Sequence, residues 1–363
     1  MANGLVAAVE EALAAFIEPG LGRDLVAGGW VASVQDDAGR VAIDVRLDFP
    51  ARRFQSELRE RLRAVIAAVP GVNEVEINID DARPTAPPPG DASALEGVRH
   101  IIAVSSGKGG VGKSTTAVNL ALALADEGAR VGMLDADIYG PSLPRMLAIT
   151  GRPTSHDGKR FEPLTGYGLQ AMSAGFLIDE EEPMVWRGSM VTQALEQLMR
   201  DTVWKDLDYL VVDMPPGTGD VQLTLAQRVK VSGAVVVTTP QDIALLDATR
   251  GLNMFTKVGV PVLGVIENMA THHCSQCGHE EPVFGEGGGE RLAQRHELEL
   301  LGSLPLDVRI REQADQGAPT VVSEPDGEVA QAYRTIARGM AARLALRSRD
   351  TATGGPRISI QED

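Results

Sequence analysis

Short runs rich in hydrophobic residues, several of them continuous, occur at residues 101–104, 130–135, 168–172, 209–213, 234–238, 262–267 and 300–304. Unbroken apolar runs of this length predict strands that are covered on both faces. Between and after them, alanine-rich or amphipathic segments predict helices at 116–127, 189–200, 221–229, 244–258 and 327–346. The alternation of the two patterns predicts an α/β fold with a doubly wound, mostly parallel sheet.

The first 81 residues follow a different pattern and predict a separate small α+β domain. Helices are expected at 5–17 and 52–69, and alternating strands at 30–34, 41–47 and 72–79. Four prolines then follow within six residues, at positions 84, 87, 88 and 89, and proline stiffens a chain and removes hydrogen-bond donors. We therefore expect a linker at 82–97, a second domain at 98–348 and a flexible tail at 349–363.

A glycine-rich loop lies between the first strand and the first helix of the second domain. Its sequence, GKGGVGKST, satisfies the P-loop pattern G-x4-G-K-[ST] in the strand–loop–helix context that this motif requires. In such a loop backbone N–H groups surround phosphates, the lysine reaches the β- and γ-phosphates, and the serine hydroxyl binds Mg²⁺. The nucleotide-binding residues are thus expected to be Gly107, Lys108, Gly109, Gly110, Val111, Gly112, Lys113, Ser114 and Thr115.

Polar residues follow three other strands, where ligands bind in doubly wound sheets. Of Asp135 and Asp137, one carboxylate can lie near a magnesium ion through a bridging water while the other orients the attacking water. The structural alternative is that the pair caps the N-terminus of a helix. Asp213 ends a buried strand, as a magnesium-anchoring Walker B aspartate does, and a plain turn is the alternative. Asn268 follows the strand 262–267, where it is expected either to contact the nucleotide or to form a turn.

The chain has two cysteines, Cys274 and Cys277, in a C-x-x-C spacing next to His272, His273 and His279. Two cysteines cannot form a disulfide framework, and this spacing is more typical of metal or redox chemistry. Because tetrahedral sites need four ligands, dimerisation would complete a four-sulfur site for a [4Fe-4S] cluster. Zinc, held by four thiolates or by two thiolates and two imidazoles, is an alternative, as is a thioredoxin-like redox pair.

The formal net charge of −16 argues against binding to nucleic acid, which requires clustered basic residues. No apolar run approaches the ~18 residues of a membrane span, and the first 20 residues contain three glutamates, unlike a basic signal peptide. We therefore expect a cytoplasmic protein without a membrane partner.

The second lysine of the loop, Lys108, makes it resemble the deviant Walker A loop of the MinD/ParA/nitrogenase-iron-protein class. In that class the extra lysine reaches the nucleotide of a partner, so the resemblance implies a homodimer. Together with DADIYGPSLPRML, DMPPGTGD, ENM, CxxCG and LPLDVRIREQADQGAPTVV, it resembles the Mrp/ApbC family of P-loop iron–sulfur cluster carriers. The first domain resembles the MIP18-type domain often fused to that ATPase, but without the cysteine near residues 48–53 that cluster-handling versions carry.

The resemblance implies a slow ATPase that uses ATP and Mg²⁺ and assembles or transfers [4Fe-4S] clusters, with a cluster donor and apoprotein acceptors as partners. It implies that Lys108, Lys113 and Asp137 are catalytic, that Asn268 reads adenine, and that Pro305 packs on the base. It also implies that Cys274 and Cys277 bridge the dimer through the cluster. The alternatives are a MinD/ParA-type positioning ATPase with structural zinc at the C-x-x-C, or a nitrogenase-like reductase, whose cysteines lie far apart in sequence.

Overall fold

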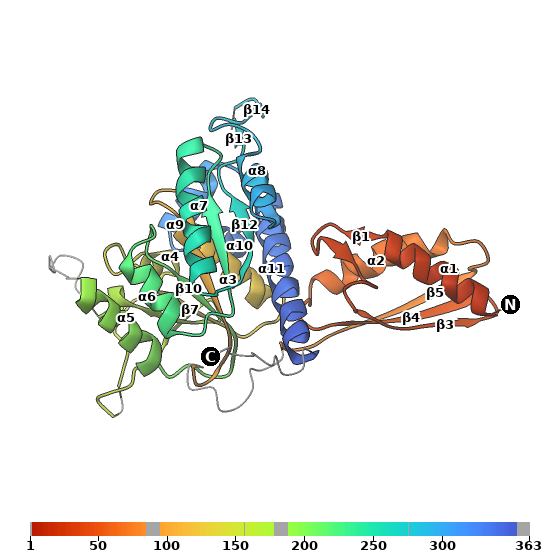
Figure 1. Cartoon of the computed structure of the whole chain (residues 1–363), viewed down its shortest axis with the longest axis horizontal. Helices are drawn as coiled ribbons and strands as arrows, with labels where there is room; N and C mark the ends of the chain where they lie inside the picture. Colours follow the sequence, from red (N-terminus) through yellow and green to blue (C-terminus); the bar gives the residue numbers. More distant parts are fainter. Residues whose placement is uncertain (1, 85–94, 156, 178–187, 275, 354–363) are drawn as a thin grey trace, which may run out of the picture. The chain divides into compact units, whose positions relative to one another are not determined.

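The computed structural model describes residues 2–84, 95–155, 157–177, 188–274 and 276–353. The chain divides into two compact units, one made of Met1–Thr85 with Arg338–Asp363 and the other of Ala86–Ala337. The expected fold class is confirmed, since the larger unit is a doubly wound α/β domain and the smaller one combines helices with a short sheet (Figure 1).

The larger unit is built on an eight-stranded sheet. Its strands are β6 (Val98–Ser105), β7 (Val131–Asp135), β8 (Leu164–Gly166), β9 (Leu169–Ser173), β10 (Leu207–Asp213), β11 (Gly233–Thr238), β12 (Val262–Glu267) and β15 (Leu300–Ser303). They lie in the order β15-β12-β11-β6-β10-β7-β9-β8, and only β8 is antiparallel to its neighbour. Every residue of β10 and β11 is buried, as expected for central strands of a parallel sheet that helices cover on both faces.

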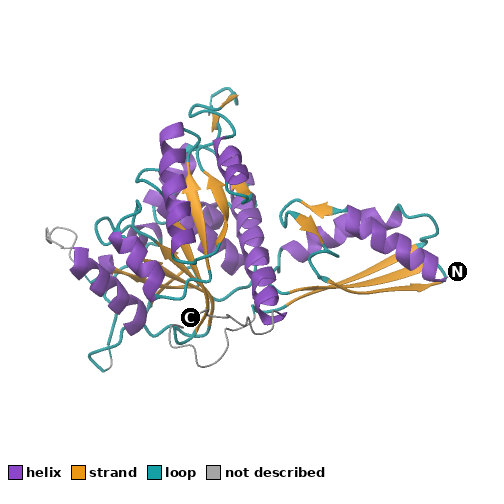
Figure 2. Ribbon diagram, viewed as in Figure 1, coloured by secondary structure: helices purple, strands orange, loops and turns teal. Residues whose placement is uncertain are grey.

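Helices cover both faces of this sheet (Figures 1 and 2). They are α3 (Lys113–Asp126), α4 (Leu143–Met146), α5 (Gly188–Asp201), α6 (Asp220–Arg228), α7 (Asp242–Lys257), α8 (Gly288–Arg295), α9 (Val308–Asp315), α10 (Thr320–Ser323) and the first part of α11 (Glu328–Thr353), with a 3-10 turn at Ala174–Phe176. Beyond the carboxyl end of β12 the chain forms a small antiparallel hairpin of β13 (His272–His273) and β14 (Glu280–Glu281).

The smaller unit contains α1 (Ala2–Ala15), β1 (Ile17–Glu18), β2 (Arg23–Asp24), β3 (Val31–Asp37), β4 (Arg40–Leu47), α2 (Phe54–Ala67) and β5 (Glu74–Asp81). β4 lies between β3, which is antiparallel to it, and β5, which is parallel. Alternate residues of β4 are buried, and α2 buries Phe54, Leu58, Leu62 and Ile66 at four-residue spacing. These two periodicities form one shared hydrophobic core between sheet and helix.

Helix α11 extends further than the sequence suggested. We expected a flexible tail from residue 349, but the helix continues to Thr353, and no glycine or proline occurs between Met340 and Thr353. Its residues from Arg338 onward belong to the smaller unit, where the Arg349 guanidinium lies 2.6 Å from the Asp48 carboxylate. The rest of the expected tail, 354–363, and residues 85–94 of the expected linker lie outside the described residues. None of the described helices is long and apolar enough to span a membrane.

Candidate functional site

The glycine-rich loop forms the wall of a cavity at the carboxyl edge of the sheet. It leaves β6 after Ser105 and enters α3 at Lys113, with Gly110 and Gly112 in the left-handed region at φ of 82° and 80°. A hydrogen bond within the loop stabilises its start, because the Ser106 hydroxyl donates to the carbonyl of Lys108 at 2.8 Å. The cavity measures about 230 Å³ and is lined by Ser106, Lys108, Gly109, Gly110, Gly112, Lys113, Ser114, Thr115, Asp137 and Pro216.

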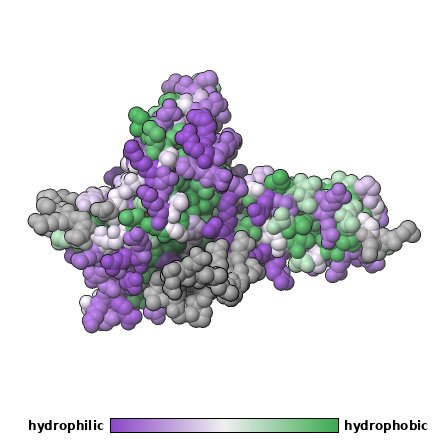
Figure 3. Space-filling model, viewed as in Figure 1, coloured by the Kyte–Doolittle hydropathy of each residue, from purple (hydrophilic) through white to green (hydrophobic). Residues whose placement is uncertain are grey.

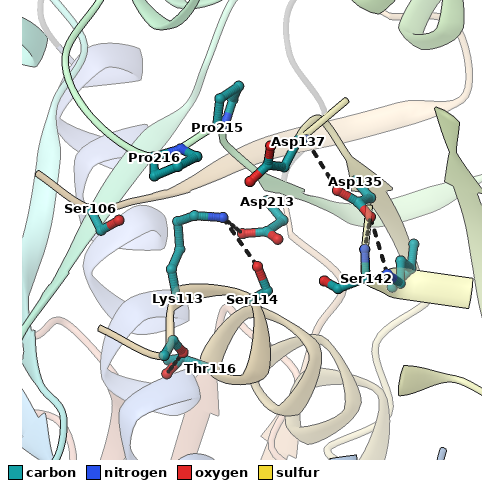
Figure 4. A network of polar contacts seen from close by, with 12 residues as sticks. Ser106, Lys113, Ser114, Thr116, Asp135, Asp137, Ser142, Asp213, Pro215 and Pro216 are labelled. Carbon is teal, nitrogen blue, oxygen red and sulfur yellow. Dashed lines mark hydrogen bonds and ion pairs between the residues drawn. The ribbon is translucent and has the colours of Figure 1, made fainter. Parts of the chain in front are cut away.

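Lys113, which lines this cavity, forms a buried ion pair with Asp213 (Figure 4). The lysine is 6% exposed and the aspartate 1%, and the ammonium also donates to the Ser114 hydroxyl at 3.3 Å. Burial raises the pKa of Asp213, while the charge of Lys113 opposes that rise. A serine hydroxyl beside a buried carboxylate is an all-oxygen donor set that fits a hard cation such as Mg²⁺.

Asp135 is a fully enclosed anchor for the loop that follows β7. Its carboxylate accepts from the N–H groups of Asp137, Ser142 and Leu143 at 3.1, 2.9 and 3.1 Å, and from the Ser173 hydroxyl at 3.2 Å. Burial, and then the charge of Asp213 on the neighbouring strand, raise the pKa of Asp135 to about 7. Two of its donors, the N–H groups of Ser142 and Leu143, lie at the start of α4, whose N-cap residue is Ser142, so Asp135 holds the beginning of this helix.

Asp137 remains open to the cavity, and the loop after β10 faces it. Pro216 of that loop lines the same cavity, and the N–H of Gly217 donates to the carbonyl of Ser106 at 3.0 Å. A residue that the sequence analysis missed, Gln222 of α6, donates to the carbonyl of Pro216 at 2.7 Å and is buried. The sequence gives little indication of this contact, because Gln222 and Pro216 are six residues apart and only the turn between them brings the amide to the carbonyl.

Asn268 follows β12 and contacts the glycine-rich loop, and Pro305 follows β15, the strand beside β12. The Asn268 amide donates to the carbonyl of Val111 at 2.9 Å, and a Cβ on Gly112 would lie 2.2 Å from its nitrogen. Pro305 lies between Leu304 and Leu306, whose N–H groups donate to the carbonyls of Glu267 and Thr271 at 2.8 Å each. Both predicted residues thus lie just beyond the carboxyl ends of two neighbouring strands, β12 and β15, outside the cavity lining given above.

Cys274 and Cys277 lie in the hairpin beyond β12, apart from the cavity lining. Cys274 is half-buried and Cys277 exposed, and both are free thiols. The backbone N–H groups of Gln276 and Cys277 lower the pKa of the Cys274 thiol, which favours the thiolate that a metal or cluster needs. His272 and His273 have partners nearby, since the imidazole Nδ1 of His272 lies 3.1 Å from the carbonyl of Leu306 and His273 contacts Glu280 at 3.4 Å.

Comparison with known proteins agrees with this geometry. Residues 97–341 match the family model of the NUBPL iron-transfer P-loop NTPases, and residues 6–79 match that of an iron–sulfur cluster assembly protein. The chain is 55% identical over 289 residues to the iron–sulfur cluster carrier protein of Escherichia coli K12, covering 79% of this chain and 78% of that protein. It is 47% identical over 337 residues to the protein of that name from Haemophilus influenzae, covering 93% and 91%.

Among solved structures, a nucleotide-binding protein from Archaeoglobus fulgidus in complex with ADP is 35% identical, with a TM-score of 0.56. The match covers 64% of this chain and 91% of that one. The resemblance to P-loop iron–sulfur carriers that the motifs indicated is therefore confirmed. The chain belongs to the family of NUBPL iron-transfer P-loop NTPases.

Proposed function

We propose that this protein binds and hydrolyses ATP and carries a [4Fe-4S] cluster, which it delivers to acceptor apoproteins. The observation that carries the proposal is the placement of two sites on one sheet edge. The phosphate-binding loop follows β6, and the hairpin with both cysteines follows β12, at the same carboxyl ends. In open α/β sheets, ligands bind beyond the carboxyl ends of the strands, where both of these sites lie.

On this proposal Lys113 and Ser114 hold the phosphates of ATP, and Lys113 leaves Asp213 to reach them. Ser114 and, through water, Asp213 would hold Mg²⁺, which supplies charge neutralisation at the phosphates when bound. Asp137, open to the cavity, orients the attacking water. The water oxygen bonds to the γ-phosphorus as the bond to the bridging oxygen breaks, which yields ADP and phosphate. Asn268 and Pro305 are proposed to contact adenine.

The cluster is proposed to be held between two copies of the chain. Each copy offers two thiols, and a [4Fe-4S] cluster takes four. Hydrophobic side chains are exposed on α7, where Ile243 is 70% and Leu246 60% exposed, and Figure 3 shows a hydrophobic surface at the upper end of this helix. Burial of this surface in a homodimer would remove apolar area from water, and Lys108 would then contact the nucleotide of the partner.

We propose further that the cluster arrives from a donor protein and that the chain acts in the cytoplasm. Its two thiols have to stay reduced to receive a cluster, and that compartment keeps cysteines reduced.

Anaerobic reconstitution with iron and sulfide tests the cluster-binding part of this proposal. Wild type should acquire visible absorption with about four iron and four sulfide per dimer. Cys274→Ser and Cys277→Ser should each lose it, whereas His279→Ala, a matched change in the same hairpin, should keep it. Zinc retained through reconstitution, with no iron bound, would contradict the carrier function.

A further inference from the structure

The residue just before Asn268, Glu267, has an unusual environment for a carboxylate. It ends the apolar strand β12 and is only 4% exposed. Its Oε1 accepts from the N–H of Gly289 at 2.7 Å, and its Oε2 lies 3.4 Å from the Ser303 hydroxyl. A buried carboxylate is retained at such a position only where hydrogen bonds offset the loss of water.

The partner of Glu267 is the first turn of α8, the helix to which the chain returns after the cysteine hairpin. This turn fits closely, because a Cβ on Gly289 would lie 2.8 Å from the Cβ of Glu267. A Cβ on Gly288 would lie 2.5 Å from the carbonyl oxygen of Pro240. Gly289 therefore lets the exit side of the hairpin be held directly on the end of β12, and Gly288 lets it approach Pro240, which follows β11.

The entry side of the hairpin is tied to the same place by backbone. The carbonyl of Glu267 accepts from Leu304 at 2.8 Å, and the N–H of Ala270 donates to the carbonyl of Leu304 at 3.0 Å. One residue on from Glu267, the Asn268 amide holds the carbonyl of Val111 in the phosphate-binding loop. Two consecutive residues thus join the nucleotide loop to both sides of the segment that carries Cys274 and Cys277.

We propose that Glu267 is a positioning residue that transmits the nucleotide state of the phosphate-binding loop to the cysteine hairpin. This inference rests on the proposed carrier function and names the side chain through which its two sites communicate. When a bound nucleotide changes the contact between Asn268 and Val111, the end of β12 moves. The hydrogen bond between the Glu267 carboxylate and the N–H of Gly289 passes this movement to the exit side of the hairpin. Without the carboxylate only the backbone ties of the entry side remain, so the response of the thiols is weakened.

Thiol reactivity of the cluster-free protein tests this directly, because the chain has only two cysteines and both lie in the hairpin. The initial rate with Ellman's reagent is measured alone, with MgADP and with a magnesium complex of a non-hydrolysable ATP analogue. Wild type should show a rate change of about fivefold or more between these states, the size of an ordinary coupling between sites. Glu267→Ala should bind nucleotide with little change in affinity and lose most of that difference.

Two further variants separate positioning from general damage. Glu267→Gln keeps an oxygen for the N–H of Gly289 and should retain most of the response. Glu290→Ala, which removes an exposed acid from the same turn of α8, should behave as wild type. If Glu267→Ala does not fold, Gly289→Ala takes its place, because its methyl group would push α8 away from Glu267.

A response of wild-type size in Glu267→Ala or Gly289→Ala, with nucleotide bound, would overturn the inference. So would a wild-type protein whose thiols react equally in all three states. Either result leaves the carrier function standing if the wild type still takes up and transfers a cluster. Conversely, a nucleotide-dependent thiol response in a chain that cannot hold a cluster would contradict the carrier function and leave the role of Glu267 intact.

Discussion

Removal of the Lys113 charge should destabilise the nucleotide-free protein strongly. Lys113 is the cation paired with Asp213, and Asp135 lies on the neighbouring strand with its carboxylate also buried. In Lys113→Met the ammonium is lost and Asp213 is left as an uncompensated buried charge. Breaking a buried pair in this way costs about 3–5 kcal/mol, which for a domain of this size corresponds to a fall in Tm of roughly 6–20 °C.

Differential scanning calorimetry of the nucleotide-free protein measures this change. Protonation of Asp213 limits the loss, and because burial raises the pKa of Asp213, the fall should become smaller as the pH is lowered. The double variant Lys113→Met/Asp213→Asn, which removes both charges, should recover most of the stability. The matched control is Lys108→Met in the same loop, at a half-buried position, and it should shift Tm by less than about 2 °C. Equal Tm values for wild type and Lys113→Met, or a double variant no more stable than the single one, would refute the reasoning.

Three other outcomes follow from the site geometry. Burial raises the pKa of Asp135 from its ordinary 3.8 to about 7, so the stability that protonated Asp135 contributes is complete below pH 3.8 and is lost as the pH rises to about 7. The Tm of Asp135→Asn should therefore rise relative to the Tm of wild type between about pH 5 and pH 7.5. A difference in Tm that stays constant over this range would contradict the reasoning. Gly107→Ala places a methyl group 2.1 Å from the Asp247 backbone and should cost about 1–3 kcal/mol in nucleotide-free stability, whereas Gly109→Ala meets nothing within 4 Å and should not; equal melting curves would refute the distinction. Gln222→Ala frees the loop that faces Asp137, so kcat for ATP should fall roughly tenfold or more with a smaller change in KM, and an unchanged kcat would assign Gln222 to stability alone.

The sheet could be predicted from sequence because its strands are runs rich in hydrophobic residues, and seven of its eight strands lie where those runs are. The exception, β8, has three residues and no such run. Helix α8 was missed for a different reason. It begins with Gly288 and Gly289, which disfavour a helix on propensity alone, and its first turn is held by the Glu267 carboxylate from a distant strand.

In the candidate site too, some features could be predicted from sequence and others could not. The phosphate-binding loop and Asp213 were recognisable because a motif fixes their order along the chain. The ion pair of Lys113 with Asp213 depends on β10 lying beside β6, which sequence order does not specify. Two of the N–H groups that donate to Asp135 lie seven and eight residues further on, in a loop whose return to the strand only the fold determines. For Glu267 a signal did exist, an acidic residue that ends an apolar strand.

Cluster transfer tests the central claim most directly. Wild type and Asp137→Ala are each loaded with a cluster and mixed with the apo form of an enzyme whose activity requires [4Fe-4S]. The rate at which that activity appears is then followed with and without MgATP. The account predicts that wild type activates the acceptor and that MgATP changes the rate, whereas Asp137→Ala binds the cluster and shows no such change. Equal rates in the two proteins, with the same response to MgATP, would contradict the coupling of ATP hydrolysis to cluster delivery.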